Sequence, residues 1–341
     1  MNKYFFVGCA FLIALVYTTS CKKEAIQNEK ILTAITIPSG FSPINFPPDN
    51  QFTPERWAFG KKLFYDTRLS KNNTVSCANC HKAELAFSDN VAFSLGDENT
   101  TGKSNAPTLT NIAYNPYFTR AGGVPTLEMQ VLVPIQEHEE FNTNILTIVD
   151  KLKADSGYVK AARNCYQREL DPYVLTRAIA NFERSIISGN SRYDQYFFQQ
   201  KNTALSAAEL RGKDLFFSSR TNCSQCHSNF NFTSYSFENN GLYIYYADSG
   251  RMRFTQLEID RGKFKVPTLR NVALTAPYMH DGSLNTLEAV IEHYNLGGKN
   301  NSTKSNFIQP LGLSTQEKAD LVAFLKALTD DDFVKNEYYQ R

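Results

Sequence analysis

The sequence lacks an excess of charge of either sign. Its 341 residues carry 36 Lys and Arg against 34 Asp and Glu, which leaves a formal net charge of +2. Proteins that bind nucleic acid usually show a basic excess or a basic stripe, so this balance argues against a nucleic-acid partner. Charged residues make up 21% of the chain and hydrophobic residues 42%, a composition that excludes a largely disordered protein. The length suits two domains.

The apolar run at the N-terminus is too short to cross a bilayer. It covers residues 4–17 and suits the core of a signal peptide. Small residues then lead into Cys21, as at a bacterial lipoprotein processing site, where the cysteine would carry a lipid anchor. Thr18 stands where leucine is usual, and a plain secretory signal is the alternative. We expect residues 1–21 to be a lipoprotein-type signal peptide and the polar, proline-rich residues 22–50 a tether. The mature chain should then lie in the cell envelope or periplasm, anchored to the membrane.

Four of the seven cysteines form two copies of one pattern. In each copy two cysteines separated by two residues are followed directly by histidine: Cys77-Ala-Asn-Cys80-His81 and Cys223-Ser-Gln-Cys226-His227. Two thiols at this spacing can add across the vinyl groups of one haem, and the histidine then becomes an axial ligand of the iron. Zinc binding and a redox disulfide are the alternatives for such a spacing. The sequence therefore predicts two covalently bound c-type haems. Cys165 has no partner pattern and is expected to be an idle thiol.

The chain also repeats itself around the two motifs. Related segments precede each motif, and a Pro-Thr-Leu segment and a Leu-Glu pair follow it at matching distances: Gly60-Lys-Lys-Leu-Phe-Tyr and Gly212-Lys-Asp-Leu-Phe-Phe, Pro107 and Pro267, Leu127-Glu128 and Leu287-Glu288. We interpret this as two related haem modules in tandem.

Apolar spacing and capping residues predict a mainly α protein with two cytochrome c-like haem domains and long loops. The first domain is expected at residues 51–200 and the second at residues 201–335. Periodicity and Ser or Thr near a helix start predict helices at residues 172–198, 206–215 and 315–328. Strand signals are few, and residues 243–247 carry the best one.

Few side chains could bind the second axial position of either iron. The candidates are His138, His280, His293, Met129, Met252, Met279 and Tyr294. Tyr294 and Pro134 each lie seven residues after the leucine of the repeat, so superposed modules would place them over equivalent haem faces. A tyrosine phenolate can bind iron, whereas proline cannot. We therefore expect a six-coordinate second haem that stores electrons and an open first haem that reacts.

Acidic residues follow the Leu-Glu pair of the first module. Cleavage of a peroxide O–O bond requires a group that carries a proton between the two oxygens, and a desolvated carboxylate has a pKa raised toward the working range. The sequence offers Glu137, Glu139 and Glu140. These three residues cannot be separated by sequence, and a solvated acidic loop is the alternative interpretation.

At this point the sequence resembles a family, the bacterial di-haem cytochrome c peroxidases, and within it the MauG-like branch. The resemblance covers roughly residues 52–330, and its most specific part is residues 265–284 (KVPTLRNVALTAPYMHDGSL). It implies two cytochrome c-like domains with a calcium ion between the haems. It also implies that the first haem reacts with peroxide and that the second accepts electrons from a small donor, a cytochrome c or a copper protein. Members of the family often form homodimers.

Position by position, the resemblance assigns roles to individual residues. It puts the distal glutamate on Glu140, the distal glutamine on Gln130 and the distal proline on Pro134. The variable sixth ligand of the second haem falls on Tyr294, where tyrosine is similar to the MauG-like branch, and His293 beside it is an alternative. The calcium ligands fall on the Asn105 side chain and on the carbonyl groups of two residues of the second module, Thr275 and Pro277. His280 is implied to be a neighbour of the ligands.

Two positions depart from the family pattern. Asp97 stands where ordinary peroxidases carry a removable histidine ligand of the first haem, so this haem should be open without activation. Arg120 stands where the family has a tryptophan between the haems, and the single tryptophan, Trp57, lies elsewhere. Charge sharing between the haems would then need Tyr114, Tyr117 or Phe118, three rings close by in the sequence.

The sequence as a whole predicts a peroxidase that reduces hydrogen peroxide to water. Peroxide would bind at the His81 haem, Glu140 would carry the proton and Gln130 would hydrogen-bond the oxygens. A MauG-like oxidase that modifies a protein or a small organic substrate is one alternative. A non-catalytic di-haem electron carrier, with His138 as an extra ligand, is another.

Overall fold

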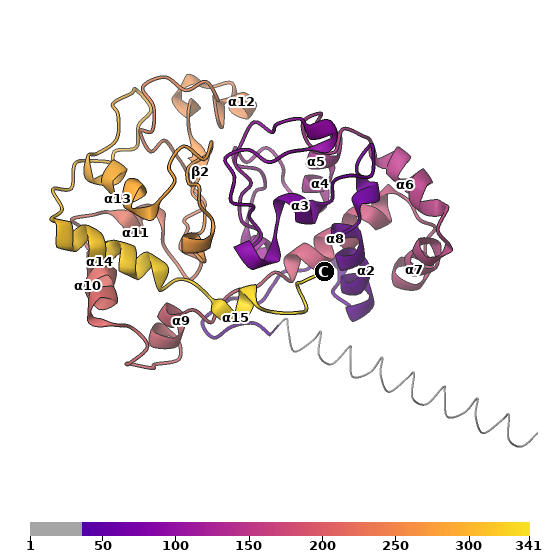
Figure 1. The fold of residues 1–341 in the computed structure, drawn as a ribbon, viewed down its shortest axis with the longest axis horizontal. Helices are drawn as coiled ribbons and strands as arrows, with labels where there is room; N and C mark the ends of the chain where they lie inside the picture. Colours follow the sequence, from indigo (N-terminus) through magenta and orange to yellow (C-terminus); the bar gives the residue numbers. More distant parts are fainter. Residues whose placement is uncertain (1–35) are drawn as a thin grey trace, which may run out of the picture.

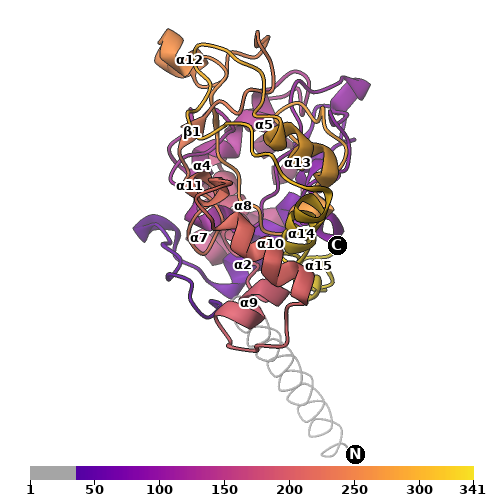
Figure 2. The ribbon, with the colours of Figure 1, turned by 90° about the vertical axis from the view of Figure 1, so that its left-hand side faces the viewer.

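The computed structural model describes residues 36–341 and is rich in helices, as predicted. Cys21 and the expected signal peptide lie outside the described residues. Figure 1 shows two groups of helices side by side, an indigo-to-magenta group from the first half of the sequence and an orange-to-yellow group from the second half. Seen from the side in Figure 2, α9 and α12 lie at opposite ends of the molecule. Within residues 36–341, no helix has the length and apolar character needed to cross a membrane.

The helices are short and are separated by long loops. The first group contains α2 (Pro54–Phe64), α3 (Cys77–Cys80), α4 (Leu127–Gln130), α5 (Leu132–Gln136), α6 (Ile145–Lys153), α7 (Ser156–Tyr166) and α8 (Pro172–Arg184). The remaining helices are α9 (Arg192–Phe197), α10 (Ala207–Phe216), α11 (Cys223–Cys226), α12 (Met252–Thr255), α13 (Leu287–Asn295), α14 (Thr315–Lys326) and α15 (Asp331–Val334). Single 3-10 turns, among them Ile112–Tyr114 and Val272–Leu274, lie between the helices.

A tightly crossed pair of helices forms the centre of each group. In the first group α2 packs on α8, and in the second α10 packs on α14. Each crossing depends on a glycine of the repeat. A Cβ on Gly60 would lie 1.9 Å from the Ala178 carbonyl oxygen, and one on Gly212 would lie 1.9 Å from that of Asp320. The repeat seen in the sequence is therefore also a repeat of helix packing.

The helices begin where the sequence offers a cap. The side chains of Thr53, Asp171, Ser206 and Ser314 accept hydrogen bonds from the first turns of α2, α8, α10 and α14. At α10 and α14 a glutamate three residues later completes a capping box. These local signals explain why both helices lie close to their predicted positions.

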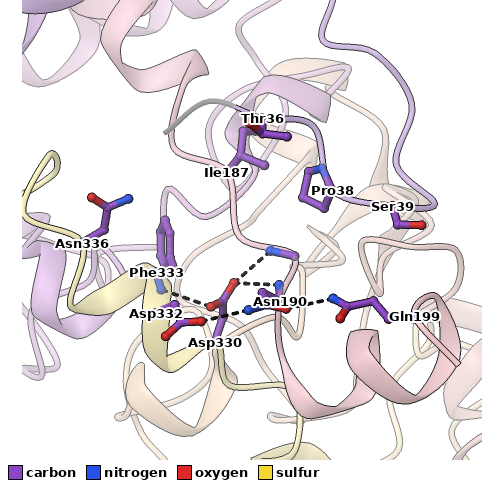
Figure 3. A pocket seen from close by; sticks show the side chains of 11 residues that line it. Thr36, Pro38, Ser39, Ile187, Asn190, Gln199, Asp330, Asp332, Phe333 and Asn336 are labelled. Carbon is purple, nitrogen blue, oxygen red and sulfur yellow. Dashed lines mark hydrogen bonds between the residues drawn. The ribbon is translucent and has the colours of Figure 1, made fainter. Parts of the chain in front are cut away.

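The helix predicted over residues 172–198 is interrupted. The Asp330 carboxylate accepts a hydrogen bond from Ser188 Oγ at 3.0 Å. It also accepts from the backbone N–H groups of Gly189 and Asn190 at 2.9 Å (Figure 3). These contacts hold the irregular segment at residues 186–191 that links α8 to α9. The contacts also form one wall of a pocket that Thr36 and Pro38 complete.

The C-terminal residues return to the first helix group, as Figure 1 shows. Phe333 of α15 and Tyr339 pack against Phe87, with ring centroids 6.0 and 5.8 Å from that of Phe87. Tyr339 Oη donates to the Ser185 carbonyl oxygen at 2.5 Å. The chain beyond α14 thus fastens the second group to the first.

The prediction of a strand at residues 243–247 was wrong. The described chain instead contains β1 (Phe237–Glu238), which pairs antiparallel with β2 (Phe264–Lys265). Tyr246 Oη accepts from the Leu242 N–H at 2.9 Å and donates to Asn239 Oδ1 at 2.8 Å, so this segment folds back on itself. A pattern of β-branched and aromatic residues predicts a strand, but it does not reveal that the hydroxyl group of one of these rings bonds the backbone of its own segment.

Candidate functional site

The first attachment motif forms a single helical turn. Cys77 and Cys80 are the first and last residues of α3, so their side chains lie near one another on one side of the turn. His81 follows, and its Nδ1 lies 2.9 Å from the Phe87 carbonyl oxygen. Because a carbonyl can only accept, Nδ1 carries the proton and the lone pair of Nε2 is free for a metal. Burial lowers the pKa of His81, which keeps the ring neutral and able to bind.

The second motif has the same arrangement. Cys223 and Cys226 bound α11, and His227 Nδ1 lies 3.1 Å from the Phe232 carbonyl oxygen. Burial lowers the pKa of His227 to about 4, so this ring is also neutral at physiological pH. The two histidines are therefore prepared in the same way to bind a metal through Nε2.

The threonine of each Pro-Thr-Leu segment supports the loop behind the histidine. Thr108 Oγ1 donates to the Ala86 carbonyl oxygen at 2.5 Å, and Thr268 Oγ1 donates to that of Asn231 at 2.7 Å. Ala86 and Asn231 each directly precede the residue whose carbonyl group bonds the histidine. This explains why the repeat includes these segments.

The donor set fits haem and does not fit a bare metal ion. In residues 36–341 the four motif cysteines and Cys165 are all unpaired, so the motif thiols are available for thioether bonds. The same residues hold no cluster of three or more His, Cys, Asp or Glu side chains suited to a metal ion. A thiol pair with one prepared histidine is the protein's contribution to the attachment of a c-type haem, whose porphyrin supplies four nitrogen ligands of the iron.

Glu140 differs from its acidic neighbours. Part of its side chain is exposed to solvent, yet the surrounding protein desolvates the carboxyl group. Burial, with smaller contributions from Glu137 and Glu139, raises its pKa to about 7. The raised pKa values of the Cys77 and Cys80 thiols are caused mainly by burial, and the Glu140 carboxylate lies near enough to add to both. A carboxyl group able to gain or lose a proton near neutral pH thus lies beside the first motif.

The other two candidate glutamates have surface partners. Glu139 forms an ion pair with Lys103 at 2.5 Å, and this contact is the main cause that lowers its pKa to about 2. Glu137 hydrogen-bonds Glu139, and its own pKa is raised chiefly by that contact. Only at Glu140 is burial the main cause of a raised pKa, whereas the pKa of Glu139 is held low by Lys103 and that of Glu137 depends on Glu139, so the three residues that the sequence could not separate differ in their electrostatics.

Asp97 contacts both the loop before the first motif and the Glu140 segment. Its carboxylate is fully buried, where it accepts from the Asn72 N–H at 2.9 Å and from Thr74 Oγ1. Its own N–H donates to the Glu140 carbonyl oxygen at 2.7 Å. Directly before it, Gly96 lies so close that a Cβ would be 2.1 Å from the Glu139 carbonyl oxygen. The family position of a removable histidine is thus a clamp on the glutamate loop.

The remaining first-module candidates have clear places. Gln130 ends α4, and its Oε1 is one of the few buried side-chain oxygens without a hydrogen-bond partner in the described part of the chain. Such an oxygen is expected to find a partner in a bound group. Pro134 lies within α5. His138 is exposed, and it lies close enough to Glu98 to contribute to the lowered pKa of the Glu98 carboxyl group. His138 therefore lies on the surface.

Tyr294 lies on α13 near the second motif. Burial raises its pKa to about 12, a hydrogen bond with Asn240 acts in the opposite direction, and the Cys226 and Cys223 thiols are near enough to add to the rise. The neighbouring His293 is engaged through Nε2, which lies 3.0 Å from the Asn240 carbonyl oxygen.

Asn240 is a residue that sequence reasoning missed. Its Nδ2 also lies 3.1 Å from Met279 Sδ, so it contacts three of the seven candidate ligands: His293, Tyr294 and Met279. No motif marks it in the sequence, because it lies about 40 to 50 residues from the side chains it contacts. We infer from these contacts that it helps to fix which side chain faces the second haem.

The one side chain expected to bind calcium, that of Asn105, is already engaged in this structure. Both oxygens that Asn105 could offer, Oδ1 and the carbonyl oxygen, accept hydrogen bonds from the Arg120 guanidinium. A cationic side chain therefore already lies at this position, and the donor set does not fit a calcium ion.

Aromatic rings connect the two halves of the chain. The Tyr114 ring lies 4.9 Å from that of Phe230, just after the second motif, and the Tyr117 ring lies 6.1 Å from that of Phe237. Trp57 is buried in the first group, where its Nε1 donates to Ser185 Oγ at 2.7 Å.

Known proteins resemble this chain over most of its length. Residues 54–203 match the family model described as di-haem cytochrome c peroxidase. The chain is 37% identical over 286 residues to the methylamine utilization protein MauG of Methylorubrum extorquens, which covers 83% of this chain and 80% of that protein. It is 34% identical over 311 residues to the cytochrome c551 peroxidase of Nitrosomonas europaea, covering 88% and 89%. A solved MauG-like protein associated with microbial copper homeostasis superposes with a TM-score of 0.84 at 34% identity, covering 89% of this chain and 97% of that one. Because the similarity extends over more than four fifths of the chain and so includes both halves of the repeat, the chain belongs to the di-haem cytochrome c peroxidase family.

Proposed function

We propose that this protein is a di-haem c-type peroxidase that reduces hydrogen peroxide to water with electrons from a small redox protein. Family membership implies two c-type haems, and the two attachment motifs are the residues that would hold them. The observation that carries the proposal is Glu140, a carboxyl group with a pKa of about 7 beside the first motif. Two electrons and two protons convert one peroxide molecule to two water molecules.

The residues near the first motif have separate tasks. When bound, each haem supplies an iron that exchanges electrons, and the first supplies the position where peroxide reacts. Glu140, as a carboxylate, takes the proton from one peroxide oxygen and delivers it to the other, so that the second oxygen leaves as water. Gln130 presents an amide with an unpartnered buried oxygen that can orient the peroxide O–H. Asp97 and Gly96 hold the backbone of the glutamate loop.

The second module would receive electrons from the donor. We propose that Tyr294 would bind the iron of the second haem, since it is the candidate buried close to Cys223 and Cys226, whereas His293 is engaged with a backbone carbonyl. The ring pair of Tyr114 and Phe230 offers a path between the halves in place of the family tryptophan.

A glutamine scan of the acidic loop tests this proposal. Glu140→Gln should lower the rate constant for peroxide turnover by about 10²–10⁴-fold, the usual contribution of a positioned acid–base group. Glu137→Gln and Glu139→Gln should retain turnover within a few-fold, because the pKa of neither carboxyl group is set near neutral pH by burial as that of Glu140 is. Absorption spectra would verify that all three variants carry both haems. Turnover by Glu140→Gln equal to that of the wild type would contradict the role.

A second candidate is a MauG-like oxidase that acts on a protein or a small organic molecule. Tyr294 and the similarity to MauG favour it. Dependence of turnover on an added reduced cytochrome c or copper protein would identify the peroxidase. Oxidation of an added organic reductant or protein side chain, without dependence on such a donor, would identify the oxidase.

We propose further that the two halves are separate haem domains and that the chain is exported. The crossed helix pairs, each next to one motif, support the domains. The N-terminal pattern and the haem-attachment chemistry support export, with Cys21 as a lipid anchor and a possible homodimer as in the resembled family. The mass of the mature protein from membranes would reveal the lipid.

A further inference from the structure

The two halves contact each other through equivalent residues of the repeat, a contact that we call the seam. The prolines of the two Pro-Thr-Leu segments, Pro107 and Pro267, are 160 residues apart. The same offset makes Asn105 equivalent to Lys265, and Arg120 equivalent to His280. The Asn105 N–H donates to the His280 carbonyl oxygen at 3.0 Å, and the Lys265 N–H donates to the Arg120 carbonyl oxygen at 2.8 Å. The seam therefore has an approximate twofold symmetry, with one such bond on each side.

On one side of the seam the Arg120 guanidinium hydrogen-bonds both oxygens of Asn105. Arg120 Nε and Nη2 donate to the Asn105 carbonyl oxygen at 3.0 and 2.7 Å, and Nη2 also donates to Asn105 Oδ1 at 3.0 Å. The Asn105 amide cannot turn away, because its Nδ2 donates to the Val91 carbonyl oxygen at 2.9 Å. Asn105 is itself buried, so these contacts are shielded from water.

On the other side of the seam an ammonium group occupies the matching place. Lys265 Nζ donates to the Tyr117 carbonyl oxygen at 2.6 Å. Tyr117 is the repeat equivalent of Pro277, one of the carbonyl groups on which the family resemblance places calcium. On each side of the seam a cationic side chain thus donates to a backbone carbonyl oxygen, that of Asn105 on one side and that of Tyr117 on the other.

The charges around the seam indicate that both side chains are cations. Burial lowers the pKa of Arg120 to about 10, while Asp281 and Asp248 act to raise it. Burial, followed by repulsion from Arg120, lowers the pKa of Lys265 to about 8. Arg120 is therefore charged at neutral pH, and most of the Lys265 population is as well. A divalent ion at Asn105 Oδ1, at a typical distance of about 2.4 Å, would lie beside the guanidinium and be repelled.

We propose that the Arg120 guanidinium takes the place of a bound metal cation at this seam and that the protein needs no calcium ion between its haems. The same substitution accounts for two departures from the family pattern, the missing tryptophan and the occupied oxygens of Asn105. The inference concerns metal content and the stability of the seam, and so it stands apart from the proposed peroxidase activity.

Metal analysis of the haem-loaded protein tests the inference. The wild type is equilibrated with about 1 mM calcium, at the weak end of the range for protein calcium sites. It is then dialysed against metal-free buffer, and calcium is measured by mass spectrometry alongside the unfolding temperature with and without EGTA. We expect no calcium above the buffer blank and no effect of EGTA. Arg120→Gln, which removes the charge, should retain about one calcium ion and unfold at a lower temperature in EGTA.

Two variants serve as controls. Arg120→Lys keeps a charge at the seam and should remain free of calcium. Arg251→Gln removes another guanidinium near the seam, one that lies 3.8 Å over the Phe237 ring and does not contact Asn105, and it should behave as the wild type. A stoichiometric calcium ion in the wild type whose removal lowers the unfolding temperature would overturn the inference. So would a haem-loaded Arg120→Gln protein that takes up no calcium. If Arg120→Gln fails to fold, the wild type and Arg120→Lys decide the question.

Discussion

At the residue scale, the chemistry of the candidate site depends on how the structure treats three similar side chains. Burial sets the pKa of Glu140 near 7, whereas the contact with Lys103 holds that of Glu139 near 2. The same residue type therefore has a pKa near neutrality at one position and a low pKa at the next. The Asp97 N–H bonds the Glu140 carbonyl oxygen and so helps to hold this segment in place.

The first prediction concerns the pH dependence of peroxide turnover. The active form of Glu140 is the carboxylate, and its raised pKa means that this form is lost as the pH falls through about 7. The second-order rate constant with peroxide should be constant above that value and fall about tenfold per pH unit below it. Glu137→Gln removes a neighbouring carboxyl group that raises the Glu140 pKa, so it should shift the fall to lower pH. Glu169→Gln, an exposed partner of Arg163, should leave the profile unchanged, and a flat profile between pH 5 and 8 would contradict the assignment.

The second prediction concerns the clamp. Asp97→Ala leaves the Asn72 N–H and the Thr74 hydroxyl without their acceptor in a buried site, at a cost of about 1–3 kcal/mol in the free energy of unfolding. The loosened loop should also slow peroxide turnover. Glu98→Ala is the matched control, since its partner Lys71 is exposed and such pairs contribute about 0–1 kcal/mol. Urea unfolding and turnover measurements on both variants test this, and equal stability of the two would exclude the clamp.

At the scale of the helices, the sequence predicted what local signals encode. Capping boxes located α10 and α14, because a cap and its partner lie three residues apart. The break after α8 could not be predicted, since Asp330 binds residues 188–190 from about 140 positions away. The attachment motifs were likewise local and predictable. The choice of Glu140 and the pairing of Arg120 with Asn105 depend on burial and distant contacts, which no spacing reveals.

The third prediction concerns the crossing helices. Gly212→Ala would bring a Cβ against the Asp320 carbonyl oxygen, so α10 and α14 must separate. Overpacking of this kind costs about 1–3 kcal/mol or more. Gly60→Ala should cost a similar amount at the α2–α8 crossing, because the same distance applies there. Gly102→Ala, where an added Cβ would meet its nearest neighbour at an ordinary 3.4 Å, is the control. Chemical denaturation would contradict the packing argument if all three variants were equally stable.

At the scale of the whole molecule, the approximate symmetry of the two halves makes their differences meaningful. Equivalent positions hold Pro134 and Tyr294, so one half offers a side chain that can bind iron and the other does not. The Asp97 carboxylate is held by Asn72 and Thr74 and His138 is exposed, so we expect neither to replace the missing ligand. We propose that two halves with one packing plan prepare one haem for reaction and the other for electron storage.

The fourth prediction follows from that division. The ferric, haem-loaded protein should show one high-spin and one low-spin signal in its EPR spectrum, and peroxide should remove the high-spin signal without prior reduction. Tyr294→Phe removes the phenolate oxygen and should convert the low-spin signal to high-spin. His293→Ala should leave both signals in place, because His293 is engaged with the Asn240 carbonyl oxygen. Two low-spin signals that do not respond to peroxide would mean that a further side chain closes the first haem, and the protein would then be an electron carrier. The four spectra together test the assignment of both haems, since each haem is altered separately.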